Sequence, residues 1–317
     1  MQNNLNIDDL AEKLIEKLTG RLNDITLQIF IDEYLSFVKR NRAAKTYEGV
    51  RLVCKHLLRY FSPLRKIDTI KLKDAEGFLD SLKENAPKAI YNYLRVVRAM
   101  WNKGIQWNYL RENPYAKIIL QKRQNQKPVY VTEQQLEEIV KHIESEIVRD
   151  AVVFAFYTGC RLGELVNLTW EDVNIKEGLL TIGSENFQTK SRKQRVVPMH
   201  PKVKEILMAK VKCKMSNEGD QTIVNLPTKN HYVFGKTNGC KYTGDYFSRR
   251  FKRACRKAGI DEAIHFHCLR HGAATRMIIN GAPVPSVQRI MGHANIQTTM
   301  TYTHPDLESL REAVNRI

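Results

Sequence analysis

Three basic side chains lie close together in the segment HFHCLRHGAATRM, which spans residues 265–277. His267 and Arg270 are three residues apart, so a helix would place them on the same face, and His271 follows directly. All three side chains donate hydrogen bonds, and such groups fill a core poorly unless each finds a partner. The segment therefore predicts a site that receives an anion.

Four further residues could take part in the same chemistry. Arg161 follows a glycine turn in TGCRLGEL, where a helix is expected to begin, and both helix-start N–H groups and a guanidinium favour an anion. An ion pair with Glu164 is the alternative interpretation of that arginine. Lys190 lies in the basic segment QTKSRKQR, and Tyr302 follows His293 by nine residues in MGHANIQTTMTYTH. Taken alone, each of these would more often be a surface or packing residue than a catalytic group.

The order and spacing of these residues resembles the tyrosine recombinase (phage integrase) family. In that family an Arg is followed by a Lys on a hairpin, by His-x-x-Arg, by Gly-His and by a Tyr nine residues later. The pattern matches TGCRLGEL, TKSRKQRVVPM, HCLRHGAATRM and MGHANIQTTMTYTH, and the resemblance covers the chain from about residue 22 to 317. Met291 replaces the usual Leu before Gly-His, a change that conserves volume. The resemblance implies these catalytic residues: Arg161, Lys190 (with Lys193 as the alternative), His267, Arg270, His293 and Tyr302.

Each residue type suits the role that the resemblance implies. Two guanidiniums stay charged at any working pH and can hold the non-bridging oxygens of a phosphodiester, with His293 donating a further hydrogen bond. Tyr302 must lose its proton as it attacks phosphorus, since a phenol has a pKa near 10, and His267 is the expected base. Lys190 is the expected acid for the leaving 5′ oxygen, and His271 is expected to give structural support. The products would be a 3′-phosphotyrosine and a free 5′-hydroxyl.

The charge of the chain indicates a polyanionic partner. The formal net charge is +17, and both parts are basic: residues 1–118 hold 21 Lys and Arg against 14 Asp and Glu, the remainder 30 against 20. We expect double-stranded DNA with a specific recombination site, although a solvated helix face is the alternative for any single lysine. In the first domain the predicted DNA contacts are Lys39, Arg40, Arg42, Lys45, Thr46, Tyr47 and Arg51.

Other function classes find little support in the sequence. The six cysteines stand singly, without a C-x-x-C pair, so a zinc or redox motif is not indicated. No carboxylate cluster for Mg²⁺ and no P-loop is present, so no cofactor is expected. No apolar run approaches the roughly 20 residues that span a bilayer, and the N-terminal segment lacks the apolar core of a signal peptide. We therefore expect a cytoplasmic protein without a membrane partner.

Helices dominate the elements that must position these residues. Helical spacing of apolar residues is clear at 5–20, 26–40 and 43–61, where it includes Val50, Val53 and Leu57. Thr132 and Gln135 predict a capping box, and LLTI and QRVVPM within 178–199 predict an antiparallel hairpin. We expect a mostly α fold with a small antiparallel β-sheet, its two domains forming a clamp around DNA. The expected parts are an extra N-terminal helix (1–21), a helical core-binding domain (22–115), a linker (116–131) and a mixed α/β catalytic domain (132–317) with a C-terminal tail (303–317).

The resemblance also implies an assembly and leaves alternatives. Leu307, Leu310 and Val314 form an apolar stripe in the tail, which would pack on a neighbouring protomer of a homo-tetramer or hetero-tetramer on two duplexes. A tail packed in cis is the alternative. The leading function is a site-specific DNA recombinase for integration or excision of mobile DNA or for resolution of dimers. A type IB topoisomerase and a catalytically silent DNA-binding protein are the competing interpretations.

Overall fold

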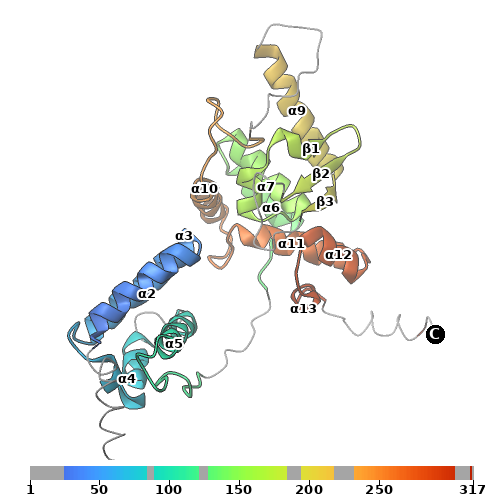
Figure 1. The fold of residues 1–317 in the computed structure, drawn as a ribbon. Coiled ribbons are helices and arrows are strands. Elements are labelled where there is room, and N and C mark those ends of the chain that lie inside the picture. The colour runs from blue at the N-terminus through green and yellow to red at the C-terminus, as the bar shows by residue number, and fades with distance from the viewer. Residues whose placement is uncertain are drawn as a thin grey trace, which may run out of the picture. The chain divides into compact units, whose positions relative to one another are not determined.

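The computed structural model describes residues 25–83, 89–120, 128–183, 194–217, 232–303 and 315 (Figure 1). Contacts within the chain form two compact units, Met1–Gln124 and Asn125–Ile317, and each unit is described by itself. The helix expected at 5–20, both candidate lysines of the hairpin loop and the apolar stripe of the tail lie outside the described residues. The domain limits, the linker and the clamp around DNA stay predictions.

The first unit is built from helices, as its apolar periodicity predicts. They are α2 (Leu27–Asn41), α3 (Ala44–Tyr60), α4 (Leu72–Lys83) and α5 (Ile90–Gln106), with the 3₁₀ helix η2 (Ile67–Thr69) before α4. Val50, Val53 and Leu57 of α3 are buried as expected, because they share one face of the helix. Phe30 and Trp101, both fully buried, meet edge to face with ring centroids 5.6 Å apart and join α2 to α5.

The segment after α5 is fixed to this unit by one arginine. Arg98 of α5 donates to the carbonyl of Tyr115 at 3.0 Å and also to the carbonyl of Ile118. The side chains of Tyr115 and Ile118 are both buried in the core of this unit. The packing of the helical unit therefore extends at least to Ile118.

The second unit contains most of the helices and the sheet. Its helices are α6 (Glu133–Lys141), α7 (Glu146–Thr158), α8 (Leu162–Asn167), α9 (Pro201–Asn217), α10 (Gly244–Lys257), α11 (His267–Ile279), α12 (Val284–Met291) and α13 (Ile296–Met300), with the 3₁₀ helix η3 (Trp170–Asp172). The capping box predicted for α6 is present, since the Gln135 N–H donates to Thr132 Oγ1 at 3.2 Å and the Thr132 N–H donates to Gln135 Oε1 at 3.0 Å. No helix of the described residues is long and apolar enough to cross a membrane.

The predicted antiparallel hairpin is confirmed. Strands β1 (Val173–Asn174), β2 (Leu179–Ile182) and β3 (Arg195–Pro198) form one antiparallel sheet in the order β1-β2-β3. In the β2–β3 pair Leu180 lies opposite Val197, and Ile182 lies opposite Arg195. This register turns Leu180 and Val197 into the core and places the arginine at the start of β3. The mostly α fold with a small antiparallel sheet is thus as the sequence predicts.

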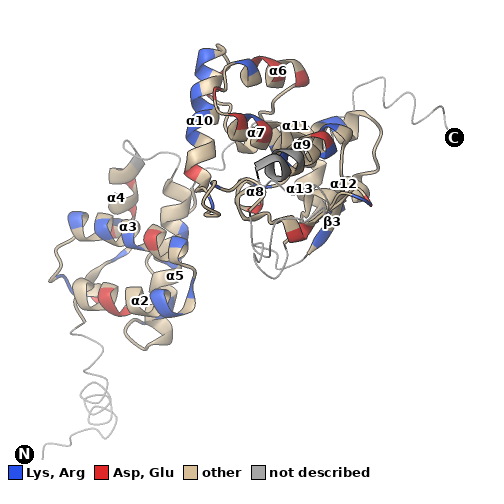
Figure 2. Ribbon diagram, turned by 90° about the horizontal axis from the view of Figure 1, so that it is seen from above, with Lys and Arg blue, Asp and Glu red and all other residues tan. Residues whose placement is uncertain are grey.

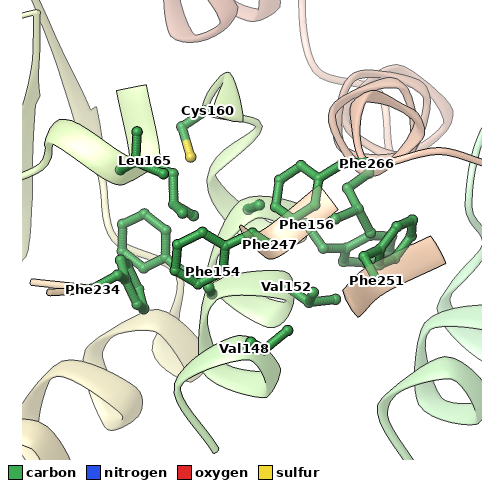
Figure 3. Close-up of a cluster of buried hydrophobic side chains, with 14 of the residues drawn as sticks. Val148, Val152, Phe154, Phe156, Cys160, Leu165, Phe234, Phe247, Phe251 and Phe266 are labelled. Atoms are coloured by element: carbon green, nitrogen blue, oxygen red, sulfur yellow. The ribbon is translucent and has the colours of Figure 1, made fainter. Parts of the chain in front are cut away.

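Helix α7 runs through the centre of the second unit's core (Figure 3). Phe154 packs on Phe234 with ring centroids 5.1 Å apart, and Phe156 is fully buried from the same helix. Helix α11 lies against α7 and also close to the chain before α6, because the N–H of Val131 donates to the carbonyl of Cys268 at 3.3 Å. A Cβ on Gly272 would lie 2.4 Å from the Val131 carbonyl oxygen, so this close approach requires glycine. The core thereby fixes the end of α7 and the start of α11, where the basic residues lie.

Candidate active site

Arg270 is held inside the protein by the ends of two helices. Its residue is 2% exposed, and its guanidinium donates to the carbonyl of Gly159 at 2.7 Å and to that of Met291 at 2.5 Å. Gly159 ends α7 and Met291 ends α12, where carbonyls lack partners within the helix. Burial and the neighbouring Arg161 lower the Arg270 pKa to about 10, so the side chain remains charged at neutral pH.

Two glycines make this arrangement possible. Gly159 and Gly292 both have a φ of 65°, in the left-handed region that favours glycine at helix ends. A Cβ on Gly159 would also lie 2.7 Å from the sulfur of Met291. The glycines of TGCR and MGH therefore turn the chain and admit close contact between α7 and α12.

Arg161 forms the ion pair that the alternative interpretation of the sequence names. Its guanidinium lies 2.8 Å from Glu164 Oε1 and also donates to the carbonyl of Gly292 at 3.2 Å. The Glu164 side chain is only 2% exposed, whereas that of Arg161 is 33% exposed. The ion pair thus orients the guanidinium, which still has an open face and further N–H donors. Arg161 can therefore be oriented by Glu164 and still bind an anion.

Arg195 is a third guanidinium that the sequence did not single out. It contacts both oxygens of Glu164, at 3.1 and 2.8 Å, and its Nε donates to the carbonyl of Ile290 at 2.8 Å. Burial raises the pKa of Glu164, but the hydrogen bond and charge of Arg195, together with the N–H and charge of Arg161, hold it at about 2. The carboxylate is therefore ionised at any working pH.

The C-terminal end of α12 binds all three guanidiniums. Three successive backbone carbonyls each accept a hydrogen bond from a guanidinium: Ile290 from Arg195, Met291 from Arg270, and Gly292 from Arg161. These carbonyls form the negative end of the helix dipole, which attracts cations. The next residue, His293, stacks on Tyr302 with ring centroids 6.1 Å apart and planes 17° apart. One turn of chain therefore brings the arginines and the tyrosine together.

Tyr302 is buried beside this turn. Only 6% of the residue is exposed, and it packs with Ala274, Val287 and Met291 of α11 and α12. Its hydroxyl lies 2.5 Å from Nδ1 of His271. Burial raises the pKa of the phenol, whereas the charges of Arg270 and Arg161 act in the opposite direction. The tyrosine hydroxyl is thus neutral at pH 7 and lies in the field of both arginines.

Three histidines belong to the site, and all are neutral at pH 7: His271 and His293 contact the tyrosine, and His267 contacts the ring of His271. The pKa of His267 is lowered to about 4 by loss of solvent and by His271 and Arg270, although part of the residue remains exposed. The pKa of His293 is lowered to about 4 by burial and by Arg270, and that of His271 is lowered mainly by burial. His293 Nδ1 lies 2.9 Å from the Thr299 hydroxyl, which fixes the ring. If the Thr299 hydroxyl donates to Nδ1, the proton of the neutral ring is on Nε2, and Nε2 can then donate a hydrogen bond to an anion.

The structure brings five of the six predicted catalytic residues into one site. Those five are Arg161, His267, Arg270, His293 and Tyr302. Lys190 and the alternative Lys193 lie outside the described residues. The hydroxyl of Tyr302 meets His271 rather than the expected base, His267, whose ring contacts that of His271 at 4.7 Å.

Comparison with known proteins agrees with this site. Residues 129–309 match the phage integrase family, and residues 26–124 match the phage integrase SAM-like domain. The chain belongs to the phage integrase family. Its function is site-specific DNA recombination, and a phosphotyrosyl intermediate is the general property of this family. The predicted family and enzyme class are therefore confirmed.

Relatives of this integrase are tyrosine recombinases. XerD of Listeria innocua is 25% identical over 287 residues, which cover 86% of this chain and 93% of the relative. XerD of Haemophilus influenzae is 26% identical over 306 residues, which cover 92% of this chain and 96% of the relative.

Among solved structures, the Tn1549 transposon integrase in complex with a circular intermediate DNA has a TM-score of 0.75 at 23% identity, covering 92% of this chain and 100% of that one. A lambda integrase dimer bound to a core site has a TM-score of 0.74 at 18% identity, covering 93% and 84%. These two likenesses establish the fold.

Helix α10 of the integrase carries a basic surface that the sequence analysis missed (Figure 2). Phe247 and Phe251 are buried on one side, while the other side exposes Arg249, Arg250, Arg253, Arg256 and Lys257. Arg250 lies over the ring of Tyr246 at 3.6 Å, which fixes its guanidinium. The spacing of FSRRFKRACRK, with Phe and Ala on one face and cations on the other, was the signal that could have found this surface.

The predicted DNA contacts of the first unit lie where α2 ends and α3 begins. Lys39, Arg40, Arg42, Lys45, Thr46 and Arg51 are exposed there, and Tyr47 is half-buried against the core. Arg51 pairs with Glu48 at 2.7 Å, so part of its charge is already neutralised. Figure 2 shows the basic residues of α3. These seven residues lie within positions 39–51, and their contact with DNA stays a prediction.

Proposed function

We propose that Tyr302 is the nucleophile of this recombinase and that Arg161, Arg270 and His293 bind the phosphate that it attacks. The observation that carries this proposal is the end of α12, where successive carbonyls hold the guanidiniums beside the tyrosine. The hydrogen bonds to carbonyls use only part of each guanidinium, so further N–H donors remain for phosphate oxygens.

The charge balance supports a phosphate as the ligand of this site. The site holds three guanidiniums and one carboxylate, Glu164, so its described part has a surplus of positive charge. A phosphodiester is a monoanion, and negative charge builds on its non-bridging oxygens as the nucleophile attacks. Fixed positive groups at that place stabilise the transition state more than the ground state.

The proposed reaction conserves the energy of the cleaved bond. The oxygen of Tyr302 forms a bond to phosphorus, the bond from phosphorus to the 5′ oxygen breaks, and that oxygen takes up a proton. We propose Lys190 as the donor of this proton, with Lys193 as the alternative. The product is a 3′-phosphotyrosyl ester and a free 5′-hydroxyl, and the 5′-hydroxyl of a partner strand can reverse the attack. The enzyme's own residues perform each of these steps, and we propose that no cofactor is needed.

The partner in this proposal is double-stranded DNA with a recombination site. The Tn1549 and lambda integrases were solved with DNA, which supports a DNA partner here. In the second unit we propose that the exposed cations of α10 contact the duplex, and in the first unit the stretch from Lys39 to Arg51. Contacts to phosphates would position the enzyme, while base contacts would select the site.

The proposal extends to the biological role, the assembly and the cellular compartment of the enzyme. We propose that this recombinase integrates or excises mobile DNA or resolves dimers, and the likeness to the Tn1549 transposon integrase supports the first of these roles. We propose that it acts as a homo-tetramer or hetero-tetramer on two duplexes, in the cytoplasm. Its tail, residues 303–317, would contact a neighbouring protomer.

Covalent trapping tests the nucleophile. Nicked duplexes carrying candidate sites from the neighbouring DNA are incubated with the enzyme and separated on denaturing gels. A slowly migrating adduct that is lost in Tyr302→Phe supports the proposal, and an adduct that persists in this variant contradicts it. Relaxation of any supercoiled plasmid, with or without a site, would instead indicate a topoisomerase.

A further inference from the structure

The hydroxyl of Tyr302 is within hydrogen-bond distance of the ring of His271, which could take its proton. Nδ1 of His271 lies 2.5 Å from the phenol oxygen, and the ring centroids are 5.4 Å apart. His271 projects from α11 and Tyr302 follows α13, so the contact joins residues 31 positions apart. The distance is that of a hydrogen bond between a hydroxyl oxygen and an imidazole nitrogen.

The electrostatics of the pair keeps both groups uncharged. Burial raises the pKa of Tyr302, and burial with His265 and Arg270 lowers the pKa of His271. Both groups are therefore neutral at pH 7, and in the Nε2–H tautomer of His271 the phenol donates and Nδ1 accepts. Other titratable or charged groups also face this pair. They are His265 before α11, His267 and Arg270 on α11, His293 after α12, and Arg161 before α8.

We propose that His271 is a catalytic residue that accepts the phenolic proton of Tyr302 during cleavage and returns it during rejoining. The inference rests on the proposed role of Tyr302. As the tyrosine oxygen bonds to phosphorus, its O–H bond breaks and the proton moves to Nδ1 of His271. The resulting imidazolium faces the phosphate that has entered the site, and in the reverse step the same proton returns to the departing phenol oxygen.

His267 takes a different place in this scheme. It lies one helical turn before His271, and the two rings meet edge to face at 4.7 Å. Part of the His267 residue is exposed, and its ring contacts the His271 ring rather than the tyrosine hydroxyl. An exposed ring of this kind is placed to donate a hydrogen bond to a phosphate oxygen.

The test compares two asparagine variants of the full-length enzyme. In His271→Asn, a side-chain amide can still accept a hydrogen bond near the position of Nδ1, but it cannot take a proton. His267→Asn is the matched control one turn away. Single-turnover cleavage is measured from pH 5.5 to 9 on a nicked duplex whose scissile 5′ oxygen is replaced by sulfur, because a thiolate leaves without an acid and isolates the deprotonation of tyrosine.

The expected result is a change in the shape of the pH profile. Wild type and His267→Asn should show a level rate above about pH 6.5, since the acceptor is already neutral. In His271→Asn the rate at pH 7 should fall by about 10²–10⁴-fold, the usual contribution of a general base, and should rise about tenfold per pH unit as phenolate forms. Adduct formation by wild type and its loss in Tyr302→Phe verify the nucleophile separately.

Two outcomes would overturn the inference while leaving the nucleophile intact. One is a uniform loss of rate in His271→Asn with an unchanged pH profile, which would mean that the histidine only positions the tyrosine. The other is a rising profile in His267→Asn alone, which would make that residue the base. A DNA-binding assay on both variants identifies misfolded protein, and His271→Gln provides a second variant with an amide acceptor if the first fails to fold.

Discussion

Glu164 and Arg195 form a buried, two-point ion pair at the base of the active site, with N···O distances of 3.1 and 2.8 Å. Only 2% of the Glu164 side chain and 8% of the Arg195 side chain are exposed. The same carboxylate also binds Arg161, which extends toward the open side of the site. A single buried carboxylate therefore fixes two of the three guanidiniums.

Replacing Glu164 with alanine should damage both folding and catalysis. Two guanidiniums would lose their partner, and removing one side of a buried pair costs about 3–5 kcal/mol. We expect a lower urea midpoint of the second unit and a strong loss of the covalent adduct. Glu164→Gln is the control, because it keeps acceptor and shape but removes the charge, and its loss should be smaller. An alanine variant with wild-type stability would show that the pair contributes nothing to the fold.

The same carboxylate gives an expected dependence of stability on pH. Its folded pKa, about 2, is below the ordinary value of 4.5, so it binds protons more weakly in the folded state. The stabilisation is therefore fully present above pH 4.5 and is lost as the pH falls from 4.5 through about 2. The contribution is about 3 kcal/mol, since each unit of pKa difference corresponds to about 1.4 kcal/mol. Unfolding by urea at pH 6 and pH 3 measures the part of this contribution that is lost above pH 3, and Glu164→Gln should flatten this part of the profile.

Arg270→Lys should slow cleavage strongly while leaving DNA binding nearly unchanged. A lysine keeps the charge, but it cannot reach the carbonyls of Gly159 and Met291 together and still offer paired donors to a phosphate. We expect a fall in cleavage rate of about 10²–10³-fold, as for loss of a preorganised donor. The assay is adduct formation on the nicked duplex, with binding measured in parallel. A rate within threefold of wild type would remove this arginine from the catalytic set.

The sequence predicted the elements whose signals are local. The burial of Val50, Val53 and Leu57 follows from helical periodicity, and the capping box of Thr132 and Gln135 involves residues three positions apart. The hairpin follows from two short β-like runs. The family pattern also selected residues of the site, because their order along the chain is characteristic even though their contacts are distant.

Contacts between distant residues explain what the sequence did not predict. Arg195 reaches a carbonyl 95 residues away, and nothing in QRVVPM distinguishes it from a surface arginine. His271 was expected to give only structural support, because a pattern cannot show which histidine of HCLRH faces the tyrosine. That choice depends on how Tyr302, which follows α13, packs against α11 and α12, which is a property of the fold.

Close packing at Gly272 provides a test of the α11 position. A Cβ there would lie 2.4 Å from the Val131 carbonyl oxygen, a backbone atom that cannot easily move. Gly272→Ala should therefore lower the free energy of unfolding by about 1–3 kcal/mol and displace His271 and Arg270. Gly49→Ala in α3 is the contrasting change, since nothing lies within 4 Å of its Cβ and alanine favours the helix by up to about 1 kcal/mol. Equal effects of the two substitutions in urea unfolding would contradict the packing argument.

The basic face of α10 should appear in the salt dependence of DNA binding. If about eight phosphates are neutralised, the slope of log K against log salt should be near −7. Arg253→Ala should make this slope less steep by about 1, because the exposed guanidinium would no longer release a counterion. Arg256→Ala is the matched control on the same helix, since Glu262 already pairs with Arg256 at 2.6 Å and a smaller change is expected. Fluorescence anisotropy at several salt concentrations measures the slopes. An unchanged slope in Arg253→Ala would show that this face of α10 lies away from DNA. Other cations of the second unit would then make the contact with the duplex.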